Sequence, residues 1–190
     1  MRAILFMVFF LFSLVFIVSC ASSLHHAVDH GDYASVENLV QEGADINQKK
    51  NGWTPLMTAV FHGNIKIVEF LVSEGADLEI RAEQGGSHHY YYGFDVSGFT
   101  ALHFAAYYNK TRIAKILLDN GAKLSLQDDN GFTALHIAAY YGNTEIAKAL
   151  IDNGAKTSMQ DEKGYTAYDY ARQYEHIKIE HYIEKAKQER

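Results

Sequence analysis

Two consecutive stretches of this sequence are near copies of each other, and they decide the fold. The first is GFTALHFAAYYNKTRIAKILLDNGAKLSLQDDN, residues 98–130, and the second is GFTALHIAAYYGNTEIAKALIDNGAKTSMQDEK, residues 131–163. Each stretch is 33 residues long. Because a fixed period of about 20–50 residues is the sequence signature of stacked repeats, the chain is predicted to form a solenoid.

The same period extends in both directions from this pair. It continues after Gly164 with YTAYDYARQ, and it occurs earlier around Gly52 in NGWTPLMTAVFHGNIKIVEFLVSEGADLEI. Ahead of that, SLHHAVDHGDYASVENLVQEGADINQKK fits the template one residue short. The predicted repeats are residues 20–51, 52–84, 98–130, 131–163 and 164–190, and residues 85–97 form an insertion between the second and the third.

Within one repeat the pattern predicts a turn, a short helix, a tight turn, a second helix and an extended return. Thr133 is placed to cap the first helix through its hydroxyl, Gly142 breaks the pair, and Gly154 suits the left-handed position after the second helix. Since one helix pair cannot bury its apolar face alone, neighbouring repeats are expected to stack. That face carries Ile146, Ala147, Leu150 and Ile151.

These motifs resemble those of the ankyrin repeat family. The family signature T-P-L-H-x-A appears as TPLM from Thr54, and as TALH from Thr100 and again from Thr133, while GADI at Gly43 and GADL at Gly75 match the return segment. The resemblance covers residues 24 to about 185. It implies an all-α solenoid of helix-turn-helix units with β-turn fingers, which acts as a non-enzymatic, monomeric protein-binding module.

Polar substitutions mark the two ends of the predicted array. In the first unit Ser35 and Asn38 stand where the second unit has Ile67 and Phe70. In the last unit Arg172, Glu180 and Glu184 replace Ala139, Ala147 and Ile151 of the preceding one. Because terminal repeats need a polar outer face, residues 24–190 are predicted to be a complete array of three internal repeats between two caps, without a missing catalytic domain.

The first twenty residues, MRAILFMVFFLFSLVFIVSC, predict export. Met1 and Arg2 form a positive start, residues 4–18 an apolar segment, and IVSC resembles the bacterial lipobox. The resemblance implies that residues 1–19 are cleaved, that Cys20 carries lipid, and that residues 20–23 link it to the array at a bacterial envelope membrane. Ordinary cleavage after Ala21 and a retained signal anchor are the alternatives.

Length, net charge and cysteine count limit the classes of domain and partner. The chain has 190 residues, of which 48% are hydrophobic and 21% charged, so it is long enough for one domain with a sizeable core. Its formal net charge of −6 argues against nucleic acid as the partner. A single cysteine excludes a disulfide framework.

Aromatic residues recur at the positions that the ankyrin resemblance assigns to the concave binding groove. At the ends of the first helices these residues form adjacent pairs, Phe61 with His62, Tyr107 with Tyr108, and Tyr140 with Tyr141. Adjacent residues of a helix point about 100° apart, so at least one of each pair is expected to be exposed. Aromatic residues also follow the repeat glycines, at Trp53, Phe99, Phe132 and Tyr165, and for Phe99 and Phe132 simple packing is an equal alternative. The predicted protein-binding residues in the repeats are Trp53, Phe61, His62, Tyr107, Tyr108, Tyr140, Tyr141 and Tyr174.

The insertion at residues 85–97 contains SHHYYYGFD. A surface loop without a binding role is usually polar, whereas this one is rich in aromatic side chains. It is predicted to be a binding finger that extends the groove between the second and third repeats. Gly85, Gly86 and Gly93 give it freedom to leave and rejoin the array. Its predicted binding residues are His88, His89, Tyr90, Tyr91, Tyr92 and Phe94.

The histidines do not form a recognisable catalytic or metal-binding motif. His103 and His136 stand at the signature position, where the family's histidine forms hydrogen bonds within and between repeats, and EHIKIEH in the tail supplies no third ligand. No catalytic residue, metal or cofactor is therefore predicted. The alternative function is a metal or haem handling accessory protein that uses His62, His88, His89 and nearby tyrosines.

Overall fold

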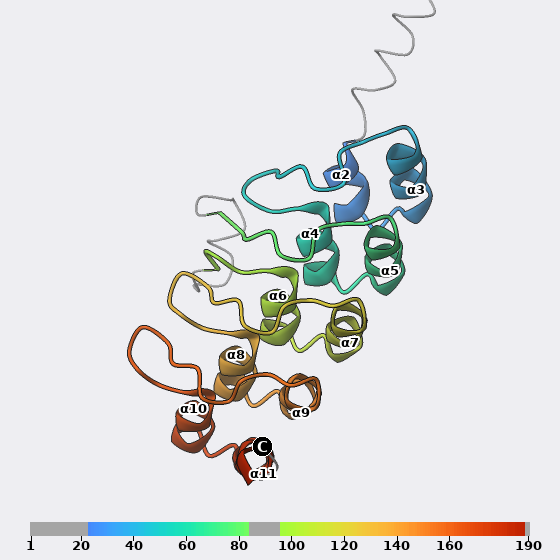
Figure 1. The fold of residues 1–190 in the computed structure, drawn as a ribbon. Helices are drawn as coiled ribbons and strands as arrows, with labels where there is room; N and C mark the ends of the chain where they lie inside the picture. Colours follow the sequence, from blue (N-terminus) through green and yellow to red (C-terminus); the bar gives the residue numbers. More distant parts are fainter. Residues whose placement is uncertain (1–22, 84–95, 189–190) are drawn as a thin grey trace, which may run out of the picture.

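The structure is a computed structural model that describes residues 23–83 and 96–188. In these ranges the chain forms helices in five pairs, and the pairs stack along one direction (Figure 1). The two layers of the stack are formed by the first and by the second helices of the pairs, and the connections between pairs extend to one side as fingers (Figure 1). The predicted all-α solenoid of helix pairs is confirmed. The pairs are α2 (Leu24–Asp29) with α3 (Tyr33–Gln41), α4 (Pro55–His62) with α5 (Ile65–Ser73), α6 (Ala101–Tyr107) with α7 (Thr111–Asp119), α8 (Ala134–Tyr141) with α9 (Thr144–Asp152), and α10 (Ala167–Gln173) with α11 (Ile177–Gln188).

The helix ends follow the predicted chemistry. The Thr133 hydroxyl accepts a hydrogen bond from the backbone N–H of His136, and the Thr133 N–H donates to Nδ1 of the same histidine at 3.1 Å. Gly142 ends α8 in the left-handed conformation with φ 70°, and Gly154 follows α9 with φ 89°. These reciprocal caps satisfy backbone groups that a short helix leaves without partners.

The core lies between the two helix layers and is built from the apolar face of every repeat. Terminal helices contribute less: Val36 is the buried residue of α3, and Ile179 and Ile183 are those of α11. Asn38 is exposed, as its polar substitution predicted. The largest fully buried side chains of the central repeats include Leu56, Leu71, Phe99, Leu102, Phe104, Leu117, Leu135 and Ile146.

Histidines connect three of the fingers to the helix layer behind them. His25, His103 and His136 place Nε2 within 3.0, 3.1 and 3.2 Å of the carbonyl oxygens of Trp53, Phe132 and Tyr165 respectively. These carbonyls belong to the residue that follows the glycine of the next repeat. The predicted role of His103 and His136 within and between repeats is confirmed.

The fingers also approach one another closely, and Gly131 stands at such a contact. It has φ +80°, and an added Cβ would lie 2.6 Å from the backbone N of Glu162. Gly121 has nearly the same φ, +83°, but nothing within 4 Å. Gly131→Ala is therefore expected to lower the free energy of unfolding by about 1–3 kcal/mol more than Gly121→Ala, because both variants share the conformational strain and only one adds overlap.

Urea unfolding of the two glycine variants measures this difference directly. Equal midpoints for Gly131→Ala and Gly121→Ala would contradict the close contact between fingers.

Candidate protein-binding site

Aromatic side chains at the ends of the first helices contact each other across the repeats. The ring centroids of Phe61 and Tyr108 are 5.1 Å apart, those of Tyr107 and Tyr141 4.9 Å, and those of Tyr140 and Tyr174 4.6 Å. In each contact the first residue of one helix-end pair touches the second residue of the pair in the next repeat. We call the set Phe61, Tyr107, Tyr108, Tyr140, Tyr141 and Tyr174 the aromatic ladder.

Contacts within the pairs make the ladder continuous. The rings of Tyr107 and Tyr108 lie 4.8 Å apart with planes at 84°, and those of Tyr140 and Tyr141 4.9 Å apart at 60°. Such edge-to-face pairs contribute about 0.5–1.5 kcal/mol each beyond the area they bury. The ladder from α4 to α10 is therefore held in place by its own contacts.

An equivalent contact between successive repeats occurs nearer the N-terminus, where the side chains are polar. His62 follows Phe61, and its Nε2 lies 2.9 Å from Oδ1 of Asp29 in the preceding repeat. His62 is exposed, as its predicted binding role requires. The first contact of the series is polar, and the three that follow are aromatic.

Exposure differs along the ladder. Tyr141 and Tyr174 expose 38% and 40% of their surface, while Phe61, Tyr107, Tyr108 and Tyr140 are half-buried. The expectation of an exposed member holds for the pair in α8. In the pair that ends α6 the expectation is not met, because both rings are half-buried.

Trp53 corrects the prediction for the residues that follow the repeat glycines. It is 3% exposed, and its ring packs 4.6 Å from Phe104 and 5.5 Å from Phe61. Trp53 therefore packs against Phe61 from the core side and is not exposed to a partner. Phe99 is fully buried, so these positions do not form one exposed row.

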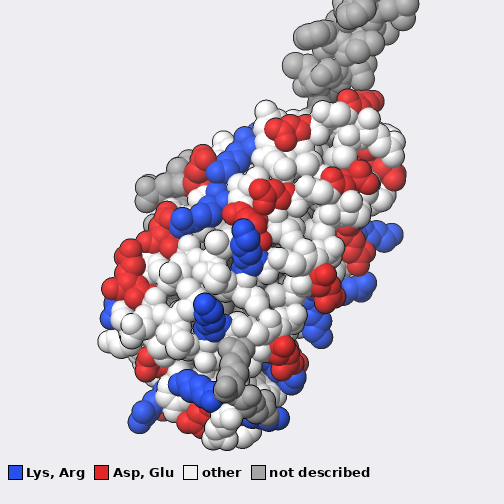
Figure 2. All heavy atoms as spheres, viewed as in Figure 1, with Lys and Arg blue, Asp and Glu red and all other residues white. Residues whose placement is uncertain are grey.

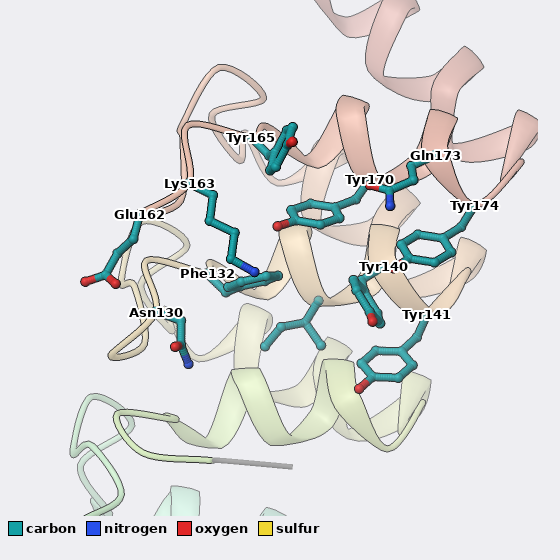
Figure 3. Close-up of a pocket in the computed structure, with 11 residues that line it drawn as sticks. Asn130, Phe132, Tyr140, Tyr141, Glu162, Lys163, Tyr165, Tyr170, Gln173 and Tyr174 are labelled. Atoms are coloured by element: carbon teal, nitrogen blue, oxygen red, sulfur yellow. The ribbon is translucent and has the colours of Figure 1, made fainter.

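A pocket of about 450 Å³ opens where the ladder crosses from α8 to α10 (Figure 3). Tyr140, Tyr141 and Tyr174 of the ladder form one side of it, and Tyr165 and Tyr170 lie on the other (Figure 3). Its remaining lining residues are Asn130, Phe132, Ile137, Glu162, Lys163 and Gln173. Volume and aromatic lining are typical of a site that accepts a side chain or a short chain segment.

Sequence reasoning missed Tyr165 and Tyr170 as site residues. Tyr165 follows a repeat glycine and is 47% exposed, unlike its counterpart Trp53. Tyr170 stands 33 positions after Ile137, so an apolar core residue is replaced by a ring with a polar tip. The exchange of isoleucine for tyrosine at this repeat position is the sequence feature that could have identified Tyr170 as a site residue.

Hydrogen bonds fix the finger side of the pocket. The Tyr170 hydroxyl donates to Oδ2 of Asp161, whose Oδ1 accepts the backbone N–H groups of Lys163 and Tyr165 at 2.9 and 2.8 Å. Burial, followed by this bond, raises the pKa of Tyr170. Burial also raises the pKa of Tyr141. These phenols therefore stay neutral at physiological pH.

Several predicted site residues lie outside the described ranges, namely Cys20, His88, His89, Tyr90, Tyr91, Tyr92 and Phe94. Within residues 23–83 and 96–188, no three side chains of the His, Cys, Asp and Glu types gather in a way that could hold a metal ion. Of the histidines named for the metal alternative, His62 lies within the described ranges and His88 and His89 lie outside them.

Comparison with protein families agrees with this geometry. The model for ankyrin repeats, in three copies, matches residues 24–128 and again residues 102–186. The chain is an ankyrin repeat protein. Proteins of this family are generally non-enzymatic interaction modules, so this ankyrin repeat protein is a protein–protein interaction module. A search of curated proteins gives no match.

Two further observations concern the surface charge and the helices of this ankyrin repeat protein. On the face seen in Figure 2, acidic and basic side chains are interspersed, without the continuous basic stripe that nucleic-acid binding requires. Of the helices in the described ranges, none has the length and apolar character to cross a bilayer.

Proposed function

We propose that this ankyrin repeat protein holds a protein partner against the aromatic ladder and its pocket, at a membrane of the bacterial cell envelope. The partner's binding there would make the protein a scaffold, an inhibitor or an immunity-like neutraliser. The observation that carries the proposal is the unbroken ladder from Phe61 to Tyr174. Tyrosine is enriched at interface hot spots because it brings a large apolar ring and a polar tip at low cost in conformational entropy.

Attachment through Cys20 is the second part of the proposal. The first helix begins at Leu24, so three residues separate the lipid attachment site from the array. Several acyl chains give stable anchoring, and the short link would hold the ladder near the membrane surface. A partner in or at the same membrane would then be bound at high local concentration.

The inserted finger is the third part. Its base is supported by hydrogen bonds between Ala82 and Phe99, 2.8 Å, and between Gly98 and Ala82, 2.9 Å. Glu83 is hydrogen-bonded to Gly52 of its own repeat at 3.0 Å. Because the array closes at this base, deletion of residues 85–95, which keeps the buried Val96 and Ser97, is proposed to leave the fold intact while the partner binds more weakly.

A double variant of the two most exposed ladder tyrosines tests the binding site. Tyr141→Ala with Tyr174→Ala is expected to reduce partner recovery from a membrane extract at least tenfold, because exposed hot-spot rings each contribute on the order of 2 kcal/mol. The half-buried rings are left in place because their removal would also loosen the core.

Tyr33→Ala is the matched control for this experiment. Tyr33 is 36% exposed, close to the 38% of Tyr141, but it lies on α3 and contacts Phe70 of α5. The control is expected to recover as much partner as the natural protein. Equal recovery by a folded double variant would refute the ladder as the binding site.

Fractionation of cells tests the anchor separately. Cys20→Ser is expected to move the mature protein from the membrane to the soluble fraction, since the thiol is the proposed point of lipid attachment. Ser22→Ala, two residues further on, is the control and is expected to stay in the membrane fraction. Retention of Cys20→Ser in the membrane would favour the signal-anchor alternative.

A further inference from the structure

The aromatic ladder repeats along the array with the spacing of the helices. The same ring contact occurs at each of three junctions, between α4 and α6, α6 and α8, and α8 and α10. Packed helices lie about 8–10 Å apart, so a ligand that follows the array meets an equivalent ring contact at about that interval. A bound segment with a matching period would use every junction in the same way.

Two peptide conformations have a period near this interval. A polyproline II helix has three residues per turn and rises about 3.1 Å per residue, which gives about 9.3 Å for each turn. Seven residues of an α-helix span about 10.5 Å. A β-strand returns to the same face every two residues, about 6.6–6.8 Å, and does not match.

Hydrogen bonding distinguishes the two conformations that match. An α-helix satisfies its own carbonyl groups, whereas polyproline II has no internal hydrogen bonds and leaves every carbonyl available as an acceptor. The pocket supplies donors for such carbonyls in the amide of Gln173, beside Tyr174, and the ammonium of Lys163, which extends toward Phe132 (Figure 3). An extended, carbonyl-rich segment uses these donors and a helix does not.

Charge points in the same direction. Glu162 and Lys163 are the charged residues that line the pocket, one of each sign, so the lining carries no net charge. The six ladder residues are uncharged rings. An uncharged segment is complementary to this surface, while a strongly acidic or basic segment would leave its charges without partners.

We propose that the segment bound on the aromatic ladder is a proline-rich stretch of the partner in the polyproline II conformation, with prolines at every third position. This inference rests on the proposed function and names the chemistry of its partner. Proline rings pack against the tyrosine rings, and the preformed conformation lowers the entropy lost on binding. The intervening residues are uncharged.

Synthetic peptides test the period on the purified full chain in detergent. One labelled peptide carries prolines at every third position with Gln-Ala between them, and a second has the same length and composition in an order in which no two prolines stand three positions apart. Fluorescence anisotropy is expected to show at least about tenfold tighter binding of the first, the difference expected when hot-spot contacts are lost. Equal affinities, or no binding of either peptide, would overturn the inference.

The ladder variants distinguish this inference from the proposed function. Tyr141→Ala with Tyr174→Ala should lower the affinity for the peptide with prolines at every third position at least tenfold, because exposed hot-spot rings are removed. Tyr33→Ala should leave this affinity unchanged. If partner capture depends on the ladder but neither peptide binds, the proline-rich segment is wrong and the interaction site stands. If capture ignores the ladder, the proposed function itself fails.

Discussion

Acidification from about pH 7 to about pH 4.5 is expected to lower the free energy of unfolding by about 2–3 kcal/mol through His103. Burial lowers the pKa of His103 from 6.5 to about 4, and burial also lowers the pKa values of His25 and His136. The unfolded chain therefore binds protons below about pH 6.5 while the native histidines stay neutral. The stability is complete above that pH and declines as the pH falls toward the native pKa.

The size of this loss follows from the shift. For His103 alone, the difference between 6.5 and about 4 corresponds to about 3 kcal/mol when the titration is complete. Asp128 acts in the opposite direction, because burial raises its native pKa. Asp32 and Asp169 have lowered pKa values and contribute only when the pH approaches the carboxyl range near 3.8.

Urea unfolding at a series of pH values measures this dependence, and the chain offers its own reference variant. The second repeat has Met57 where the third has His103, so His103→Met is compatible with the repeat. This variant is expected to be less stable near pH 7, because the hydrogen bond to Phe132 is lost, and to depend less steeply on pH. A stability that stays constant between about pH 7 and 4.5 would contradict the burial of neutral histidines.

Truncation of Phe104 is expected to lower the free energy of unfolding by more than the other single substitutions named above. Its ring is fully buried and packs 4.6 Å from Trp53 and 5.3 Å from Phe99. Phe104→Ala should lower the free energy of unfolding by about 3–5 kcal/mol, because the cavity lies where two repeats meet. Phe104→Leu, which keeps most of the volume, should cost less than about 1.5 kcal/mol.

The same substitution tests whether the core supports the binding surface. Phe104 stacks against Tyr108 with ring planes 4° apart, so the ladder residue rests on a core residue. Under conditions where Phe104→Ala remains folded, partner affinity is expected to fall although Phe104 is inaccessible to a partner. Unchanged affinity, measured beside the Phe104→Leu control, would mean that the ladder keeps its geometry without this support.

The 33-residue period predicts the fold because the second to fifth repeats each begin with a glycine and cap their first helix with a threonine two residues later. Thr133 and Gly142 act as their positions in the repeat predict, and His136 acts as the ankyrin resemblance implies. The helix-end tyrosines were also predictable, since their position in the repeat fixes their side of the array. Local sequence specifies these features without knowledge of the neighbouring repeat.

Features that depend on packing between repeats were harder to predict. Trp53 and Tyr165 occupy equivalent positions, yet the first is buried and the second exposed, because Trp53 is covered by Phe104 of the following repeat. The diagonal order of the ladder contacts likewise depends on how adjacent helices are offset. One repeat alone contains neither piece of information.

The hydrogen bond between His62 and Asp29 makes one end of the series of ladder contacts unlike the other. Three equivalent ring contacts would by themselves accept a repetitive segment in either direction and in more than one register. A polar contact near α2 and a tyrosine-lined pocket near α10 distinguish the two ends. A partner whose segment carries a polar group at one end and a bulky ring at the other would therefore bind in one orientation.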